Sequence, residues 1–323
     1  MKNVCIVGCG AISGTHADAL SKIEEARIVS VCDIVPERAD RLAAKCGAKA
    51  YYSLEAALAD SQNEYYHICT PHYLHCKMIS SVLDAGKCAV TEKPAVMTRE
   101  ELSVMASWDR TRVFYIFQNR HNNAIKALLS DIDGTVTGKL LGIKANHTWN
   151  RGAAYYNSGA WRGKWATEGG GVLINQSIHT LDLALLVGGD VKAVSAVMQN
   201  NSLKGVIEVE DTANVFCRFS SGATLNFFAT NANAVDSAPF IEYYFENATY
   251  RYDNYSLYKN GVFLAADSPD APGKACWGAG HEAEFAEIYG YGRGADPGMV
   301  TGTLKTVFAA YESAKAGGKE ILL

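Results

Sequence analysis

A glycine-rich turn near the start of the chain has the residue types that bind a phosphate. Residues 8–14 read Gly-Cys-Gly-Ala-Ile-Ser-Gly and stand between a short apolar run and a helical pattern. Glycines let the backbone approach a pyrophosphate closely, and the N–H groups at a helix start attract its charge. Ser13 takes the third glycine position. The motif predicts a dinucleotide site, in which we place Gly8, Gly10, Ala11 and Ile12.

An acid follows the next apolar run. Asp33 comes 23 residues after Gly10, near the spacing of the carboxylate that accepts the ribose hydroxyls of a dinucleotide. A carboxylate accepts a hydrogen bond from a free 2′-hydroxyl and repels a 2′-phosphate. Ile34 is apolar, and Arg38 is the nearest cation and is included among the cofactor-binding residues. We therefore predict NAD in preference to NADP. A tight glycine turn in another kind of α/β domain is the alternative.

A lysine between an acid and a proline could stabilise charge on a substrate oxygen. Glu92-Lys93-Pro94 ends a strand expected over residues 88–91, and ligands of an open α/β sheet bind at the carboxyl ends of its strands. A lysine there is expected to point toward the cofactor, and the proline can hold a cis peptide. The ordinary interpretation of a lysine is a solvated surface charge, and the position of Lys93 argues against it.

A polar row follows three consecutive glycines at 169–171. The helix predicted over residues 172–187 has one apolar stripe, and Asn175, His179 and Asp182 fall at i, i+4 and i+7 on a neighbouring face. Histidine exchanges protons near neutral pH, so this face suits the edge of an active site. A hydrogen-bonded, partly buried histidine is the alternative.

The loop before these glycines is rich in aromatic and basic side chains. Such faces and donors suit a sugar ring, and a packed loop or a subunit contact is the alternative. The substrate-binding residues that we predict outside the helix and Lys93 are Asn119, Arg151, Tyr156, Trp161, Arg162 and Trp165.

Taken together, these motifs resemble the Gfo/Idh/MocA family of nicotinamide-dependent oxidoreductases. The resemblance covers nearly the whole chain. It implies an N-terminal Rossmann domain, a C-terminal α/β domain with an open, mostly antiparallel sheet, and hydride transfer on sugars, polyols or nucleotide sugars. The runs that carry it are residues 8–14, Thr70-Pro71 with His75, Glu92-Lys93-Pro94, Trp161-Arg162-Gly163-Lys164-Trp165 and residues 169–182.

The resemblance also implies roles for single residues. Lys93 matches the family's catalytic lysine and His179 its catalytic histidine, while Asn175 stands where many members have an aspartate. His179 would take the hydroxyl proton, Lys93 would stabilise negative charge on the same oxygen, and Asn175 would hold an adjacent hydroxyl. The residues implied at the edge of the cofactor are Thr70, Pro71, His75, Glu92 and Lys93.

Hydride chemistry needs no metal, because the nicotinamide takes the electrons. We therefore predict no metal, although His72, His75 and Cys76 lie close together in the sequence. Two other functions stay open: a non-catalytic NAD-binding sensor or regulator on the same fold, and a reductase of a non-sugar substrate such as a dihydrodiol.

The elements that must hold these residues change type near residue 120. Before it, short apolar runs alternate with helical patterns, which is typical of βαβ units and a parallel sheet. After it come the repeated short strands of a mostly antiparallel sheet and two closing helices, near 281–291 and 298–316. We expect a dinucleotide-binding Rossmann domain over residues 1–119 and a substrate-binding and oligomerisation domain over residues 120–323.

Composition favours a globular cytoplasmic protein. The 323 residues are 48% hydrophobic with a formal net charge of −4, which gives no electrostatic footprint for nucleic acid or a membrane surface. No apolar run reaches the ~18 residues of a membrane span, and the N-terminal run is too short and glycine-rich for a signal peptide. Nine cysteines, an odd number without a CxxC pair, indicate buried thiols in a reducing compartment.

Two C-terminal strands predict an assembly. Over residues 213–219 and 223–230, apolar side chains on one face alternate with Phe216 and Phe228 on the other. One face can pack on the helix that carries His179, and the other would then expose more aromatic surface than a soluble monomer usually shows. We predict a homodimer or homotetramer built through the C-terminal sheet, as the resemblance also implies.

Overall fold

The computed structural model of the chain describes residues 1–267 and 279–323, and its contacts divide it into two units. The first holds Met1–Gln118 and Ala279–Pro297, and the second holds the described parts of Asn119–Gly278 together with Gly298–Leu323. The pattern change near residue 120 coincides with the first crossing. Ala279–Pro297, however, belongs with the first unit, whereas the sequence analysis placed all of residues 120–323 in the second.

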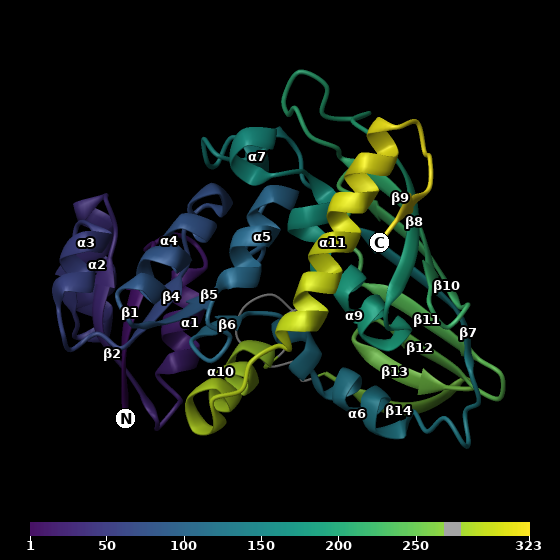
Figure 1. The fold of residues 1–323 in the computed structure, drawn as a ribbon, viewed down its shortest axis with the longest axis horizontal. Coiled ribbons are helices and arrows are strands. Elements are labelled where there is room, and N and C mark those ends of the chain that lie inside the picture. Colours follow the sequence, from purple (N-terminus) through teal and green to yellow (C-terminus); the bar gives the residue numbers. More distant parts are fainter. Residues whose placement is uncertain (268–278) are drawn as a thin grey trace. The chain divides into compact units, whose positions relative to one another are not determined.

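The first unit is built on a parallel six-stranded sheet in the order β3-β2-β1-β4-β5-β6 (Figure 1). Chain order reverses between β1 and β4, and in such sheets the ligand binds outside the carboxyl ends of the strands at this point. Its strands are β1 Lys2–Val7, β2 Ala26–Cys32, β3 Lys49–Tyr51, β4 Tyr65–Ile68, β5 Cys88–Thr91 and β6 Val113–Tyr115. Its helices are α1 Ser13–Leu20, α2 Pro36–Cys46, α3 Leu54–Ala59, α4 His72–Asp84, α5 Arg99–Ser107 and α10 Gly280–Tyr291.

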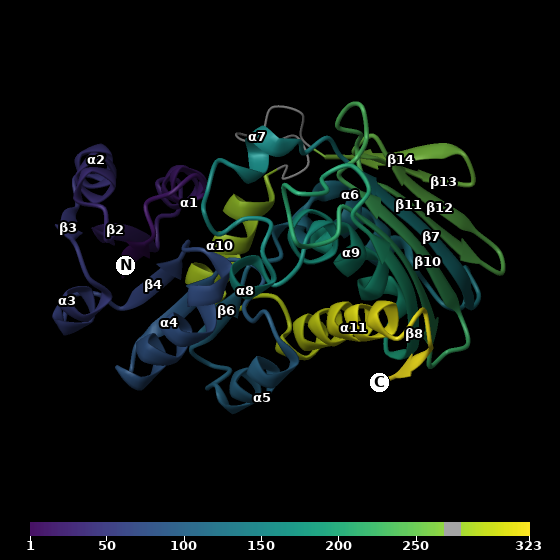
Figure 2. The ribbon, with the colours of Figure 1, turned by 90° about the horizontal axis from the view of Figure 1, so that it is seen from above.

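The second unit contains a nine-stranded sheet in the order β14-β13-β12-β11-β7-β10-β9-β8-β15, in which only β7 and β10 pair in parallel. Figure 2 shows α9 and α11 on the same face of this sheet. Its strands are β7 Leu140–Thr148, β8 Val191–Gln199, β9 Thr212–Phe219, β10 Thr224–Thr230, β11 Phe240–Phe245, β12 Thr249–Asp253, β13 Ser256–Lys259, β14 Val262–Ala266 and β15 Ile321–Leu322. Its helices are α6 Asn123–Asp131, α7 Ala153–Tyr156, α8 Trp165–Glu168, α9 Ile178–Gly188 and α11 Pro297–Lys315, with a 3-10 turn Gln118–His121 at the unit boundary.

The two faces of this sheet differ as the alternation predicts. Val215 and Phe227 are buried on the face that α9 covers, where Tyr243 also donates from its hydroxyl to the Leu183 carbonyl at 3.0 Å. On the opposite face, Phe216 is 42% and Val197 54% exposed. A shallow hollow of about 210 Å³ lies on this outer face.

The helix expected over residues 172–187 is broken. Val172–Gln176 forms a π-helical turn and α9 begins at Ile178. The segments Trp165–Gln176 and Ile178–Gly188 meet at 60°. The turn is anchored from outside, because the Glu210 carboxylate accepts from the Gly171 and Leu173 N–H groups at 2.9 and 3.0 Å. Apolar periodicity runs through the break and therefore hides it from the sequence. No single helix of the described residues is long and apolar enough to cross a membrane, although the bent pair Trp165–Gln176 and Ile178–Gly188 together passes that test of length and composition.

Candidate active site

Two positions of the glycine turn suit glycine for different reasons. At one, the backbone conformation and a close neighbour exclude a side chain, and at the other, the open space lets a ligand approach. Gly8 has φ +90°, and a Cβ there would lie 2.8 Å from the Cys69 carbonyl at the end of β4. A Cβ at Gly10 would meet nothing within 4 Å, so the turn is open on that side. Ser13 fits the third glycine position because its hydroxyl donates to the Gly10 carbonyl at 2.7 Å. The start of α1 follows at once after Ala11, with Ile12 at the N-cap position and without a side-chain cap among the described residues.

Asp33 is tied to the same turn. Its Oδ2 accepts from the Cys9 N–H at 2.7 Å and its Oδ1 accepts from the Val35 N–H at 2.8 Å. Each carboxylate oxygen has further capacity to accept, as ribose hydroxyls would require. Ile34 is 81% exposed and Arg38 is exposed on α2. The arrangement fits the adenosine ribose of a dinucleotide.

His75 joins the ends of β4 and β5. Its Nδ1 lies 2.8 Å from the Pro94 carbonyl oxygen and its Nε2 lies 2.7 Å from the Thr70 carbonyl oxygen. Burial lowers the pKa of His75, and these two carbonyls oppose that shift. The side chain therefore clamps the two segments that carry Thr70-Pro71 and Lys93-Pro94, whose peptide bond is cis. Its contacts are to the protein backbone, so we assign it to positioning the strand ends.

Glu92 enters a buried cluster that sequence reasoning missed. Its Oε1 lies 3.0 Å from His16 Nε2 and 3.7 Å from His281 Nε2. His16 Nδ1 in turn lies 2.8 Å from His67 Nδ1, and His67 Nε2 lies 2.5 Å from the Tyr289 hydroxyl. Burial alone would raise the pKa of Glu92, but its interactions with His16 and His281 hold it well below the usual value. Glu92 thus anchors the end of β5 beside Lys93.

This cluster is assembled from α1, β4, α10 and the end of β5, so no local pattern could reveal it. The ligand atoms of His16, Glu92 and His281 lie within 4.8 Å of one another, a spacing at which a metal ion can be considered. Among the residues described, however, these side chains already interact with one another and with His67. The nearby His75 is occupied by two carbonyl groups. That no metal is needed stays a prediction.

In the second unit, Asn175 and His179 lie on either side of the break at Ser177. The Asn175 amide nitrogen donates to Oε1 of Glu168, and the Gly163 N–H donates to Oε2 of the same carboxylate. Glu168, Asn175 and His179 are 0%, 7% and 9% exposed. The signal for Glu168 in the sequence is an acid directly before three glycines.

Asn175 lies in the π-helical turn, whereas His179 and Asp182 lie three residues apart in α9, so the three residues are not on one continuous helix as the sequence predicts. The Asp182 carboxylate accepts two hydrogen bonds from Arg120, at 2.7 and 2.8 Å, and one from the Thr303 hydroxyl at 2.8 Å. This buried ion pair gives Asp182 a structural role. Asn119 is 6% exposed, and its amide oxygen is buried without a hydrogen-bond partner in the ranges 1–267 and 279–323.

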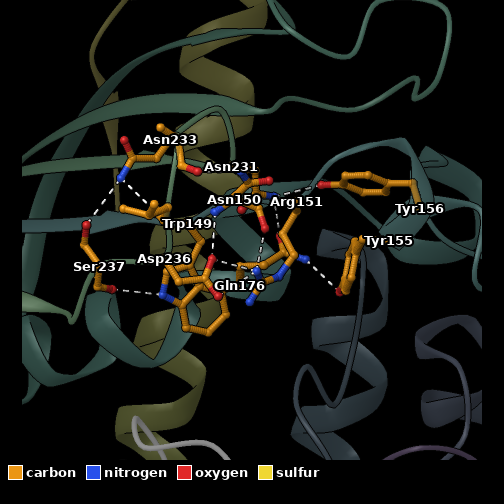
Figure 3. Close-up of polar contacts among 12 residues, drawn as sticks. Trp149, Asn150, Arg151, Tyr155, Tyr156, Gln176, Asn231, Asn233, Asp236 and Ser237 are labelled. Carbon is orange, nitrogen blue, oxygen red and sulfur yellow. Dashed lines mark hydrogen bonds and ion pairs between the residues drawn. The ribbon is translucent and has the colours of Figure 1, made fainter.

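Side chains of the loop before the glycines make stacking and polar contacts, and Figure 3 shows the polar contacts of Arg151, Tyr155 and Gln176. The Arg162 guanidinium lies 4.4 Å above the Tyr155 ring and donates a hydrogen bond of 2.5 Å to its hydroxyl. Arg151 stacks 4.4 Å over Trp149 and pairs with Asp236 at 2.8 Å. The Gln176 amide donates to the Tyr155 hydroxyl at 3.1 Å, which links the loop to the π-helical turn.

The other aromatic residues of the loop divide between core and surface. Tyr156 is 3% exposed, its hydroxyl accepts from the Asn231 amide at 2.8 Å, and it belongs to a small apolar cluster with Ile207. Trp165 is 40% exposed and Trp161 stacks on Arg162. For Tyr156 the packed-loop alternative therefore describes the structure well, while its contact with substrate stays a prediction.

Comparison with known proteins agrees with both units. Residues 2–112 match the model of an oxidoreductase family with an NAD-binding Rossmann fold, and residues 125–251 match the GFO/IDH/MocA C-terminal domain. Glucose-6-phosphate 3-dehydrogenase of Bacillus subtilis is 26% identical over 74% of this chain and 71% of its own length. Inositol 2-dehydrogenase of Rhizobium meliloti is 25% identical over 67% of this chain and 65% of its own length.

Among solved structures, the WlbA dehydrogenase of Chromobacterium violaceum in complex with NADH and UDP-GlcNAcA has a TM-score of 0.88 and 27% identity, and the match covers 100% of this chain and 96% of that one. The WlbA dehydrogenase of Bordetella pertussis follows with a TM-score of 0.85 and 26% identity, over 100% of this chain and 98% of its own. The family models match in order from residue 2 to residue 251, and the full fold is shared with these enzymes. The chain therefore belongs to the Gfo/Idh/MocA family of oxidoreductases, with an NAD-binding Rossmann domain and the family's C-terminal domain.

Proposed function

We propose that this protein is an NAD-dependent dehydrogenase that moves a hydride between the nicotinamide and a secondary alcohol or ketone of a sugar, polyol or nucleotide sugar. The observation that carries the proposal is the presence, in one family member, of a dinucleotide turn and of both predicted catalytic side chains, Lys93 and His179. A sensor on the same fold would have no need of that pair.

The cofactor half of the site supports NAD. Gly10 leaves the turn open for a pyrophosphate, the start of α1 offers N–H groups, and Asp33 offers carboxylate oxygens to the ribose hydroxyls. NAD supplies the hydride acceptor when it is bound. Thr70 and Pro71 follow β4 and Lys93 follows β5, so these residues stand at the carboxyl ends where the ligand of such a sheet binds.

Side chains of this protein then transfer the hydroxyl proton and stabilise the negative charge on the reacting oxygen. His179 accepts the hydroxyl proton of an alcohol, or returns it to a ketone. Lys93 donates a hydrogen bond to the same oxygen and stabilises negative charge there. Asn175 holds a neighbouring hydroxyl, and the stacked side chains of Arg162 and Tyr155 offer an aromatic face and donors beside the turn.

The relatives support a sugar-like substrate. They include dehydrogenases named for glucose 6-phosphate and inositol and a structure with a bound nucleotide sugar, UDP-GlcNAcA. We propose that the substrate of the present chain belongs to the same class of sugar-like compounds. A dihydrodiol or another non-sugar substrate is the alternative that the test below distinguishes.

We also propose that the enzyme acts in the cytoplasm as a homo-oligomer assembled through the outer face of the nine-stranded sheet. The eight cysteines among the described residues are free thiols, as in reducing compartments. Phe216 on β9 and Val197 on the neighbouring strand β8 are exposed on the outer face of the sheet. Pairing this surface with its copy would remove apolar area from water.

A turnover screen tests the enzymatic proposal. NADH absorbance is followed with NAD and a panel of glucose 6-phosphate, inositol, UDP-sugars and a dihydrodiol. Lys93→Ala and His179→Ala should each lower kcat by ~10²–10⁴ on the best substrate while NAD binding persists, because neither residue belongs to the glycine turn. Lys77→Ala, exposed on α4, is the matched control. NAD binding without turnover of any compound would favour the sensor, and full activity in either catalytic variant would reject the residue roles.

A further inference from the structure

Arg162 is a half-buried cation in the loop before the glycines, and among the described residues it forms no ion pair with a carboxylate. Its guanidinium is held by aromatic side chains: it lies 4.4 Å from the centre of the Tyr155 ring and 4.5 Å from that of the Trp161 ring. One of its nitrogens donates to the Tyr155 hydroxyl at 2.5 Å. These contacts fix the plane of the guanidinium and use one of its five N–H groups.

The acidic side chains of the same region pair with other groups. Asp236 pairs with Arg151 at 2.8 Å, and the two oxygens of Glu168 accept hydrogen bonds from a backbone N–H and from a side-chain amide. The positive charge of Arg162 is therefore not balanced by a carboxylate within residues 1–267 and 279–323. A cation that is partly withdrawn from water in this way is stabilised by an anion that reaches it.

The Tyr155 hydroxyl is a second donor at the same place. Its oxygen accepts from Arg162 and, at 3.1 Å, from the Gln176 amide nitrogen, so its own proton serves neither bond. The Gln176 amide oxygen accepts from Asn231 at 3.0 Å, which leaves the Gln176 nitrogen for Tyr155. Burial raises the pKa of Tyr155, and the opposing effect of Arg162 is smaller, so the hydroxyl keeps its proton at neutral pH. No acceptor for that proton is present in the described part of the chain.

A guanidinium and a neighbouring hydroxyl of this kind are suited to an oxyanion. The planar fork of an arginine matches two oxygens of a phosphate or a carboxylate, and both groups have only acceptor atoms to offer. We infer that Arg162 and Tyr155 form a subsite for a phosphate or carboxylate group carried by the substrate. The inference rests on the proposed function and narrows its substrate class to charged derivatives of a sugar or polyol.

The subsite lies close to the residues proposed to hold the reacting part of the substrate. Gln176, which contacts the Tyr155 hydroxyl, follows Asn175 directly in the π-helical turn. Asn175 is the residue proposed to hold a hydroxyl next to the reacting carbon. A charged substituent on the same sugar therefore comes within reach of Arg162.

Matched neutral and charged sugars test the inference. With NAD as cofactor, kcat/KM is measured for glucose and for glucose 6-phosphate, glucuronate and UDP-glucose. The wild type should prefer at least one charged compound to glucose by tenfold or more. Arg162→Met should lower that preference by about ten- to a hundredfold, the scale of hydrogen bonds to a charged group. Whether glucuronate or the phosphate compounds lose more identifies the anion.

Two further variants separate the held guanidinium from charge in general. Arg162→Lys keeps the charge without the planar fork, so its preference should fall between those of the wild type and Arg162→Met. Lys164→Met removes an exposed charge two residues away and should leave the preference unchanged within twofold. A wild type without a preference for any charged compound, an unchanged preference in Arg162→Met, or an equal loss in Lys164→Met would overturn the inference. If Arg162→Met does not fold, Arg162→Lys decides by the same ratio.

A binding measurement distinguishes failure of this inference from failure of the proposed function. If the wild type turns over no compound of the panel, the proposed function fails. Calorimetric titration of glucose 6-phosphate and glucuronate into NAD-saturated protein then tests the subsite, because bound NAD fills the other site for phosphate groups. An anion that binds the wild type at least tenfold more tightly than Arg162→Met supports the subsite. Equal Kd values, or binding of neither anion, overturn it.

Discussion

Asp33 serves both the fold of the glycine turn and the proposed choice of cofactor. Its oxygens hold the Cys9 and Val35 N–H groups, so the carboxylate is fixed in place before any ligand arrives. A fixed anion favours hydroxyls and repels a 2′-phosphate. NAD should bind more tightly than NADP in the wild-type protein, and Asp33→Ala should narrow that difference by about tenfold or more.

Fluorescence titration with each dinucleotide measures the two Kd values. NAD affinity itself should fall in Asp33→Ala, because the turn loses two anchoring bonds. Ile34→Ala is the control, since Ile34 is 81% exposed and neighbours the acid without holding the turn. A wild-type protein that prefers NADP would show that Arg38, not Asp33, dominates recognition.

At the level of residues, the sequence gives site predictions where the pattern is local. Gly8, Gly10 and Asp33 could be found because strand, turn, helix and acid follow one another at set spacing. The partners of Glu92 could not, because His16 and His281 reach it from two distant helices. The difference lies in sequence separation, since periodicity carries no information on which distant side chains meet.

At the scale of elements, the turn at Val172–Gln176 depends on glycine. A Cβ on Gly171 would lie 1.9 Å from the backbone oxygen of Glu210, which cannot move without disturbing the start of β9. Gly171→Ala should therefore destabilise the protein by about 2 kcal/mol or more, and should lower kcat because Asn175 and His179 flank the same turn.

Differential scanning fluorimetry and the sugar assay measure the two effects. Gly302→Ala is the matched control: it lies within α11 and a Cβ there would meet nothing within 4 Å. In a helix interior that change should be neutral or stabilising by up to about 1 kcal/mol. Equal Tm values for the two alanine variants would contradict this account of the turn.

Most elements could be predicted from hydrophobic pattern, and the failures have physical causes. Burial alternates along most of the long strands β7, β9 and β10 because one face of the sheet is buried. β3, with three residues, and β15, with two, are too short for a period to develop. The sequence predicts a continuous helix around His179 because both arms are apolar, whereas the turn before the break is held by Glu210, which is distant in the sequence.

We expect the whole protein to be an oligomer in which the outer face of the nine-stranded sheet packs against the same face of a second copy. Light scattering at micromolar concentration should give at least twice the 34.9 kDa of one chain. Phe216→Asp combined with Phe228→Asp should dissociate it, because charges would be buried without partners at the interface. Tyr73→Asp is the control, because Tyr73 is an exposed aromatic residue on α4 and not on the sheet. A wild-type mass near that of one chain would reject the assembly, and a double variant that stays associated would reject this face.

The return of α10 to the first unit has a consequence for how such a protein can be made and recombined. Ala279–Pro297 completes the first unit and brings His281, Phe285 and Tyr289 into it. During synthesis, Met1–Gln118 therefore leaves the ribosome long before Ala279–Pro297 has been made. Until then, part of the apolar core of the first unit stays uncovered. For the same reason, the nucleotide end cannot be exchanged between relatives by a single cut near residue 119; a working chimera needs α10 to travel with it.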